Sequence, residues 1–161
     1  MFTEYKNLPN NSRVWIYQAD RIFTAQEVEL ISTKAIDFIE QWTRHGDDLK
    51  GSFTIKYNQF LILAVDESFN DVSGCSIDAS VALIKSIASE AEVDFFDRTK
   101  ICFMTNNEVF DLPMIAIKKN VESGKISADT LTFNNLISTV DDLSENWLVE
   151  SQNSWLKKYF K

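Results

Sequence analysis

Hydrophobic and polar positions follow two different periods along the first two thirds of this chain, and the changes of period mark its predicted elements. Residues 13–19 are mostly β-branched and aromatic and lie between turn-forming residues, which predicts a first strand. From Val28 to Trp42 the apolar side chains recur every three or four residues, as on one face of a helix. Thr24 and Glu27 have the spacing of a capping box at the start of that helix.

The same alternation of strand and helix continues. Residues 53–57 alternate apolar and polar side chains, and residues 60–65 are continuously apolar, which predicts a half-buried strand beside a central one. Residues 77–91 carry their apolar side chains on one helical face. Residues 100–112 then have the pattern of a hairpin around Asn106-Asn107.

The resulting order, β-α-β-β-α-β, is that of the split βαβ sheet of ferredoxin-like proteins, here with one added strand. Beyond residue 112 the patterns predict a helix, a short strand and two brief helices. The chain has 161 residues, 45% of them hydrophobic, which suffices for one core, and only four Gly and two Pro. We therefore predict a single α+β domain over residues 1–161, with a core of about residues 13–112 and a mainly helical C-terminal extension, residues 113–161, packed on it.

The net charge of the chain limits which classes of molecule it can bind. The 24 acidic and 16 basic residues give a formal net charge of −8, which repels nucleic-acid phosphates and anionic lipid surfaces. The chain opens without a signal-peptide pattern, and no apolar run approaches the roughly 20 residues of a membrane span. We expect a cytoplasmic protein that binds no nucleic acid and does not enter membranes. In that reducing compartment Cys75 and Cys102 should be free thiols.

The segment Ser73-Gly74-Cys75-Ser76-Ile77-Asp78 is the leading candidate site. It places a cysteine in the first turn of the second predicted helix, among backbone N–H groups that lack helical partners. These groups and the positive end of the helix dipole stabilise a thiolate or a bound anion. With the side chains of Ser73, Ser76 and Asp78 beside the backbone of Gly74, the segment favours a binding site for a small ligand or a protein partner.

A thiol-dependent enzyme is the alternative. Cys75 would be its nucleophile, His45, the only histidine, its base, and Asp66 the carboxylate that orients the imidazole. The structural roles are plainer: a small cysteine packed at a loop-to-helix junction, and a histidine that complements the end of the first helix before Gly46. The sequence does not reveal whether the three side chains meet, so binding and catalysis both stay open.

Other chemistries have weaker support. The single histidine and two distant cysteines lack any zinc spacing, and the acidic residues near Asp66 lack an EF-hand register, so we predict no metal and no cofactor. Gly46 and Gly51 imitate the spacing of a phosphate-binding loop, but the lysine that should follow the second glycine is missing. An interaction module that uses Trp147 and Trp155 is a third alternative. The patterns do not indicate an oligomeric state.

Five stretches resemble a family of small uncharacterised bacterial proteins that are often labelled ABC-transporter ATPases. They are Arg13-Val14-Trp15-Ile16-Tyr17-Gln18, Asp66-Glu67-Ser68, Ser73-Gly74-Cys75-Ser76-Ile77-Asp78, Phe133-Asn134-Asn135-Leu136 and Ser154-Trp155. The similarity spans nearly the whole chain. We do not expect ATPase activity, because the chain has neither a Walker lysine nor a signature loop.

Overall fold

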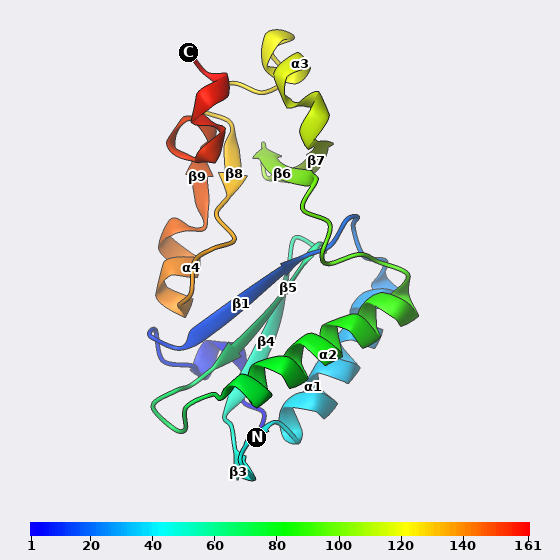
Figure 1. Ribbon diagram of the computed structural model, residues 1–161, viewed down its shortest axis with the longest axis vertical. Coiled ribbons are helices and arrows are strands. Elements are labelled where there is room, and N and C mark those ends of the chain that lie inside the picture. Colours follow the sequence, from blue (N-terminus) through cyan, green and yellow to red (C-terminus); the bar gives the residue numbers. More distant parts are fainter.

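The computed structural model describes all 161 residues and contains two larger sheets, one above the other along the long axis of the molecule, and a two-stranded hairpin (Figure 1). The first sheet has three antiparallel strands in the order β1-β5-β4. These strands are β1 (Arg13–Gln18), β4 (Gly51–Lys56) and β5 (Phe60–Val65). All side chains of the central strand β5 are buried. A strand covered on both faces has no polar face, which explains its continuously apolar sequence.

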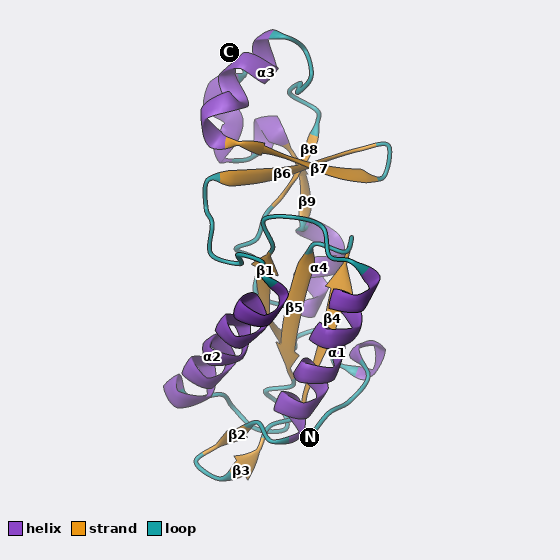
Figure 2. Ribbon diagram, turned by 90° about the vertical axis from the view of Figure 1, so that its right-hand side faces the viewer, coloured by secondary structure: helices purple, strands orange, loops and turns teal.

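Three helices cover the two faces of this sheet. They are α1 (Ala25–Glu40), α2 (Gly74–Ala91) and α4 (Val140–Asn146). α1 and α2 lie side by side on one face, and α4 lies on the other (Figure 2). Because side chains alternate along β5, Leu61 and Leu63 pack beneath α1 and α2, whereas Phe60 and Ile62 pack toward α4. The predicted capping box at the start of α1 is confirmed.

The second sheet contains four antiparallel strands in the order β7-β6-β8-β9. Its strands are β6 (Lys100–Thr105), β7 (Glu108–Pro113), β8 (Leu131–Phe133) and β9 (Leu148–Glu150). The predicted hairpin between β6 and β7 is confirmed, and both turn residues, Asn106 and Asn107, have positive φ. Phe103 of β6 packs with Ile117 and Leu156 in a core separate from that of the first sheet.

The α+β class is confirmed, and the first five predicted elements occur in the predicted order, but the sheet departs from the ferredoxin-like arrangement at its last strand. That arrangement would place residues 100–104 beside β1. β6 instead pairs with β7 on one edge and β8 on the other, so both of its edges are occupied. The region after residue 112 is not simply helical either, because β8 and β9 complete the second sheet.

A small hairpin separates α1 from β4. It consists of β2 (Thr43–Arg44) and β3 (Asp47–Asp48) joined by His45 and Gly46, whose φ angles are 52° and 90°. Positive φ at both turn positions is typical of a tight type I′ turn. His45 therefore does not end the first helix, as the sequence suggested, because α1 stops at Glu40.

Short helical segments complete the chain. They are η1 (Tyr5–Asn7), η2 (Met114–Ala116), α3 (Ile117–Glu122), η3 (Ser151–Asn153) and η4 (Trp155–Tyr159). None of the helices has the length and apolar character needed to cross a membrane.

Two glycines give a matched test of packing. A Cβ on Gly51 would lie 3.1 Å from the Ala64 carbonyl oxygen and 3.3 Å from Ile39 Cγ2. We expect Gly51→Ala to lower the free energy of unfolding by about 1–3 kcal/mol, because a close-packed interior resists added volume. Gly74 has open space around its Cβ position, so Gly74→Ala should change stability by less than about 1 kcal/mol. Urea denaturation measures both variants, and equal stabilities would contradict the prediction.

Candidate functional site

The start of α2 is held by reciprocal bonds between two serines. Ser73 Oγ accepts a hydrogen bond from the Ser76 backbone N–H (3.2 Å), and Ser76 Oγ accepts one from the Ser73 N–H (3.3 Å). Ser76 is buried; its hydroxyl donates to the Thr43 carbonyl (2.9 Å), and its carbonyl accepts from Trp42 Nε1 (2.9 Å). Ser76 thus attaches α2 to the segment after α1 and to the β2–β3 hairpin, whereas Ser73 caps the helix.

The other predicted residues at this helix start face outward. Gly74, Cys75 and Asp78 are exposed, and the Cys75 thiol is free. Cys102, the second free thiol, is buried in β6. A ligand at the start of α2 would therefore meet Gly74, Cys75 and Asp78. The hydroxyl groups of Ser73 and Ser76 are already engaged in hydrogen bonds within the protein.

No hydrogen bond joins the three residues predicted for a thiol-dependent enzyme. His45 is exposed at the tip of the β2–β3 hairpin. Asp66 is buried, and its carboxylate accepts from the Ser68 N–H (3.0 Å) and hydroxyl (2.5 Å) and lies 3.9 Å from Lys50 Nζ. The carboxylate thus closes a turn after β5. Across the whole chain, no three His, Cys, Asp or Glu side chains form a group that could hold a metal ion.

A cavity of about 750 Å³ opens between the two sheets. None of the residues predicted for the ligand site or for the thiol-dependent enzyme lines it, but Trp155, predicted for the interaction module, does. Its walls come from four separate parts of the chain. They are the end of β1, residues 95–102 before and within β6, residues 132–136 at and after β8, and residues 149–155 within and after β9. We call this cavity the inter-sheet cleft.

A chain of amide hydrogen bonds fixes three walls of the inter-sheet cleft relative to one another. Gln18 Nε2 donates to the Lys100 carbonyl (3.1 Å), and Gln18 Oε1 accepts from Asn135 Nδ2 (3.2 Å). Asn135 Oδ1 in turn accepts from Trp147 Nε1 (2.9 Å). Because Trp147 is buried, its indole N–H depends on this partner.

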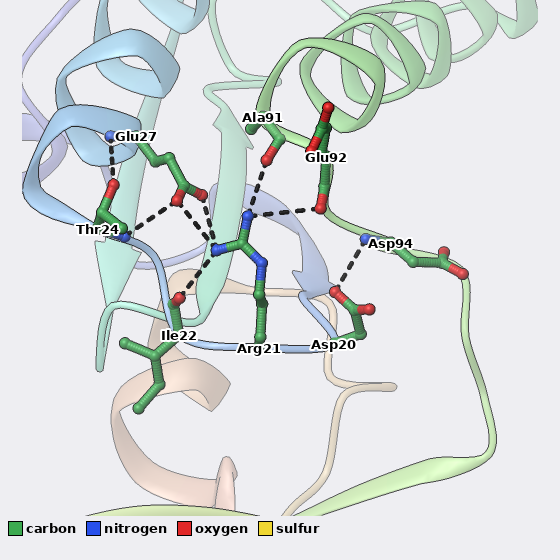
Figure 3. Close-up of polar contacts among 8 residues, drawn as sticks. All are labelled: Asp20, Arg21, Ile22, Thr24, Glu27, Ala91, Glu92 and Asp94. Carbon is green, nitrogen blue, oxygen red and sulfur yellow. Dashed lines mark hydrogen bonds and ion pairs between the residues drawn. The ribbon is translucent and has the colours of Figure 1, made fainter.

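Arg21 ties together the helix ends behind the β1 wall (Figure 3). Its guanidinium lies between the start of α1 and the end of α2. Nη1 donates to Glu27 Oε1 (3.0 Å), and Nη2 donates to the Ala91 carbonyl (2.8 Å). The hydrogen bond from Arg21 lowers the pKa of Glu27, and the same bond raises the pKa of Arg21. The contact is therefore a charge-assisted clamp on the two helices.

The residue next to Arg21 extends this clamp to the cleft. The Asp20 carboxylate accepts the Asp94 backbone N–H (3.0 Å), as Figure 3 shows. The Asp20 carbonyl accepts from Lys100 Nζ (2.8 Å), which holds the first residue of β6 near the end of β1. Lys100 is thus partly engaged, whereas the exposed guanidinium of Arg98, also a lining residue, forms no ion pair.

Large apolar side chains gather at the rim of the inter-sheet cleft. Phe96 is 47% exposed, Leu136 92% and Trp155 51%, and all three line the cavity. The sequence left two roles open for Trp155, an anchor for the C-terminal segment or an exposed contact, and its position at the rim agrees with the second. Gln18, Asn135 and Trp155, which come from three distant parts of the chain, all line this cleft.

No protein-family model, no curated protein and no solved structure matches this chain. The resemblance to small bacterial proteins labelled ABC-transporter ATPases therefore stays a prediction.

The two thiols should differ widely in reactivity. Burial raises the pKa of the Cys102 thiol to about 12, with the charge of Asp111 adding to the effect. We expect iodoacetamide at about pH 8 to label exposed Cys75 at least about 100-fold faster than Cys102, measured by peptide mass spectrometry. His45→Ala should leave the Cys75 rate within about twofold, because no hydrogen bond connects them. A tenfold slower rate in that variant would instead favour the enzyme alternative.

Asn135 should matter more for stability than a neighbouring amide of the same cleft. Asn135→Ala leaves the buried Trp147 N–H without its acceptor, so we expect a loss of about 1–3 kcal/mol in the free energy of unfolding. Asn153 is exposed and forms no side-chain hydrogen bond, so Asn153→Ala should change stability by less than about 0.5 kcal/mol. Urea denaturation measures the stability of both variants. Similar losses would contradict a stabilising role for the bond between Asn135 and Trp147.

Proposed function

We propose that this chain is a binding protein whose inter-sheet cleft holds a ligand with both apolar surface and hydrogen-bonding groups, and that it acts in the cytosol. The observation that carries the proposal is the gathering of Phe96, Leu136 and Trp155, all at least 47% exposed, around one cavity. Single exposed apolar side chains are common on protein surfaces, but several gathered at one place typically mark a binding site.

The size and lining of the inter-sheet cleft support the same conclusion. Its volume of about 750 Å³ lies within the range of roughly 300–1,000 Å³ that is usual for ligand sites. The exposed amides of Asn134 and Asn153 add hydrogen-bonding groups beside the apolar rim. The walls are fixed by the Gln18–Asn135 bond and by Lys100, so a ligand would meet a largely preformed surface.

Charge indicates which ligands fit. Arg98 and Lys100 supply two positive charges to the lining, and Asp97 one negative charge. Hydrogen bonds from the Thr99 hydroxyl and N–H lower the pKa of Asp97, so its carboxylate is already satisfied within its own turn. The free guanidinium of Arg98 then favours a ligand that carries an acidic group in a protein whose net charge is otherwise −8.

The start of α2 is the second candidate. Its exposed Cys75 lies in the first turn of an 18-residue helix, beside exposed Gly74 and Asp78, which keeps the predicted ligand site and the thiol-dependent enzyme as alternatives. The inter-sheet cleft is the better supported of the two sites, because it combines a concave volume of about 750 Å³ with apolar and polar groups.

Titration with 1-anilinonaphthalene-8-sulfonate tests the cleft, because this dye combines aromatic rings with an acidic group. We expect binding to the native protein, with Leu136→Asp and Trp155→Ala each raising the dissociation constant about tenfold through lost apolar contact. Ile115→Asp is the matched control, since Ile115 is 95% exposed but lies outside the cleft. Absence of binding, or equal effects of all three variants, would contradict the proposal.

A further inference from the structure

The outer edge of β1 is only half covered. β1 is the edge strand of the first sheet, and β5 pairs with its inner edge. On the outer edge, the Val14 N–H donates to the Ser138 carbonyl (2.9 Å), and the Val140 N–H donates to the Ser12 carbonyl (2.9 Å). These two bonds form an antiparallel bridge between Arg13 and Thr139. The chain thus covers the outer edge at the beginning of β1 with a single bridge and leaves the rest of that edge without a backbone partner.

Backbone alternation identifies the groups that this leaves open. In an antiparallel strand, successive residues direct their N–H and C=O groups to opposite edges. The Ala19 N–H turns inward and donates to the Gln59 carbonyl (2.8 Å), whereas the Val14 N–H turns outward. Ile16 and Gln18 therefore direct their backbone N–H groups outward with Val14. Both residues line the inter-sheet cleft, so this open edge faces into it.

A turn withdraws the chain from the open positions. In the register of the Arg13–Thr139 bridge, Leu136 would stand opposite Ile16 and Asn134 opposite Gln18. The Leu136 N–H instead donates to the side-chain oxygen of Asn134 (3.2 Å), which folds the segment back on itself. The position beside Ile16–Gln18 is consequently left to an outside group, and Leu136 stands 92% exposed at its border.

We propose that the occupant of the inter-sheet cleft is an extended peptide segment with an acidic side chain, which adds as a strand to the open edge of β1. This inference rests on the proposed function of the cleft. Strand addition satisfies the outward backbone groups of Ile16 and Gln18 directly, which a purely apolar ligand leaves unpaired. Three residues of a peptide, about 10 Å in length, match this open stretch.

Side chains of such a peptide also find partners. Alternate residues of an added strand point to opposite sides, so one set would meet the apolar rim formed by Leu136 and Trp155. Arg98, exposed and without an ion pair, would receive the acidic side chain. Backbone pairing would then supply much of the affinity and the side chains the selectivity.

Amide exchange in the full-length protein tests the open edge first. All four residues Trp15 to Gln18 lie opposite β5, but by the same alternation only Trp15 and Tyr17 turn their N–H groups toward it. We therefore expect the backbone amides of Ile16 and Gln18 to exchange at least about tenfold faster than those of Trp15 and Tyr17. Equal protection of all four amides in the free protein would overturn the inference, because the edge would then already be occupied.

A second experiment tests whether an extended peptide is the occupant. Binding peptides are selected on the full-length chain from a phage-displayed library of random heptapeptides. A synthetic copy of the best binder should slow exchange at Ile16 and Gln18 at least about tenfold. N-methylation of the peptide on the residues that face β1 should weaken binding at least about tenfold, whereas methylation on the alternate residues should not. Selected peptides that are rich in Asp or Glu should also bind Arg98→Ala more weakly.

A variant of the protein gives an independent measurement. Ile16→Pro removes the outward N–H without removing a hydrogen bond to β5, a change that edge strands tolerate. It should weaken peptide binding about tenfold more than Ile16→Ala, which controls for the lost side chain. If Ile16→Pro fails to fold, the methylated peptides decide the question alone.

The outcomes separate the two proposals. Failure to select any peptide, or binding that is insensitive to the pattern of methylation, overturns strand addition. If the anilinonaphthalene dye still binds and Leu136→Asp still weakens it, the cleft remains a binding site for a small ligand. If dye binding is also absent, both proposals fall.

Discussion

The structure depends on one constraint: both faces of β5 carry only apolar side chains and must be shielded from water. Leu61 and Leu63 on one face and Phe60 and Ile62 on the other are all fully buried, so the first sheet needs two separate covers. α1 and α2 provide the first cover from nearby sequence. The second comes from residues far along the chain, including Leu143 and Trp147. Without that return, a face of large apolar side chains would be exposed, at a cost of about 25 cal/mol for each Å².

The return of the chain creates the inter-sheet cleft. The second sheet lies beyond the first, and the segment between β8 and α4 must travel back along β1 to reach the uncovered face. It makes two backbone bonds with β1 near Val14 and a side-chain bond from Asn135 to Gln18, with a turn between them. The clamp around Arg21 and the bond from Lys100 to Asp20 stiffen the opposite wall. The cleft is therefore a product of how the second cover is attached.

Local patterns predicted the local features of this fold. The capping box of Thr24 and Glu27, the buried strand 60–65 and the hairpin at Asn106-Asn107 are each encoded within a few residues, and each is confirmed. The partner of β6 was not encoded locally, because its free edge pairs with a strand some 30 residues further on. The two-residue strands around His45 were too short to show a period.

The candidate site likewise has features that local sequence predicts and features that depend on tertiary contacts. The capping role of Ser73 agrees with the predicted helix start, whereas the exposure of Cys75 contradicts the expectation of a small cysteine packed at this junction. Whether Cys75, His45 and Asp66 meet depends on tertiary placement, and no hydrogen bond joins them. The inter-sheet cleft escaped prediction because its walls come from four segments, and no single segment carries a motif. Arg98 and Leu136 become candidate binding residues only because the fold places them at the same cleft.

Because the cleft walls come from distant parts of the chain, a ligand can bind only when nearly the whole chain is folded. Residues from 16 to 155 must be in place before the cavity exists, so a nascent or truncated chain that lacks the C-terminal segment has no cleft to fill. An occupant that binds only this completed state adds RT ln(1 + [L]/Kd) to the free energy of unfolding of both sheets together. The protein's lifetime in the cell would then rise with the concentration of its partner, and degradation would remove it selectively when that partner is scarce.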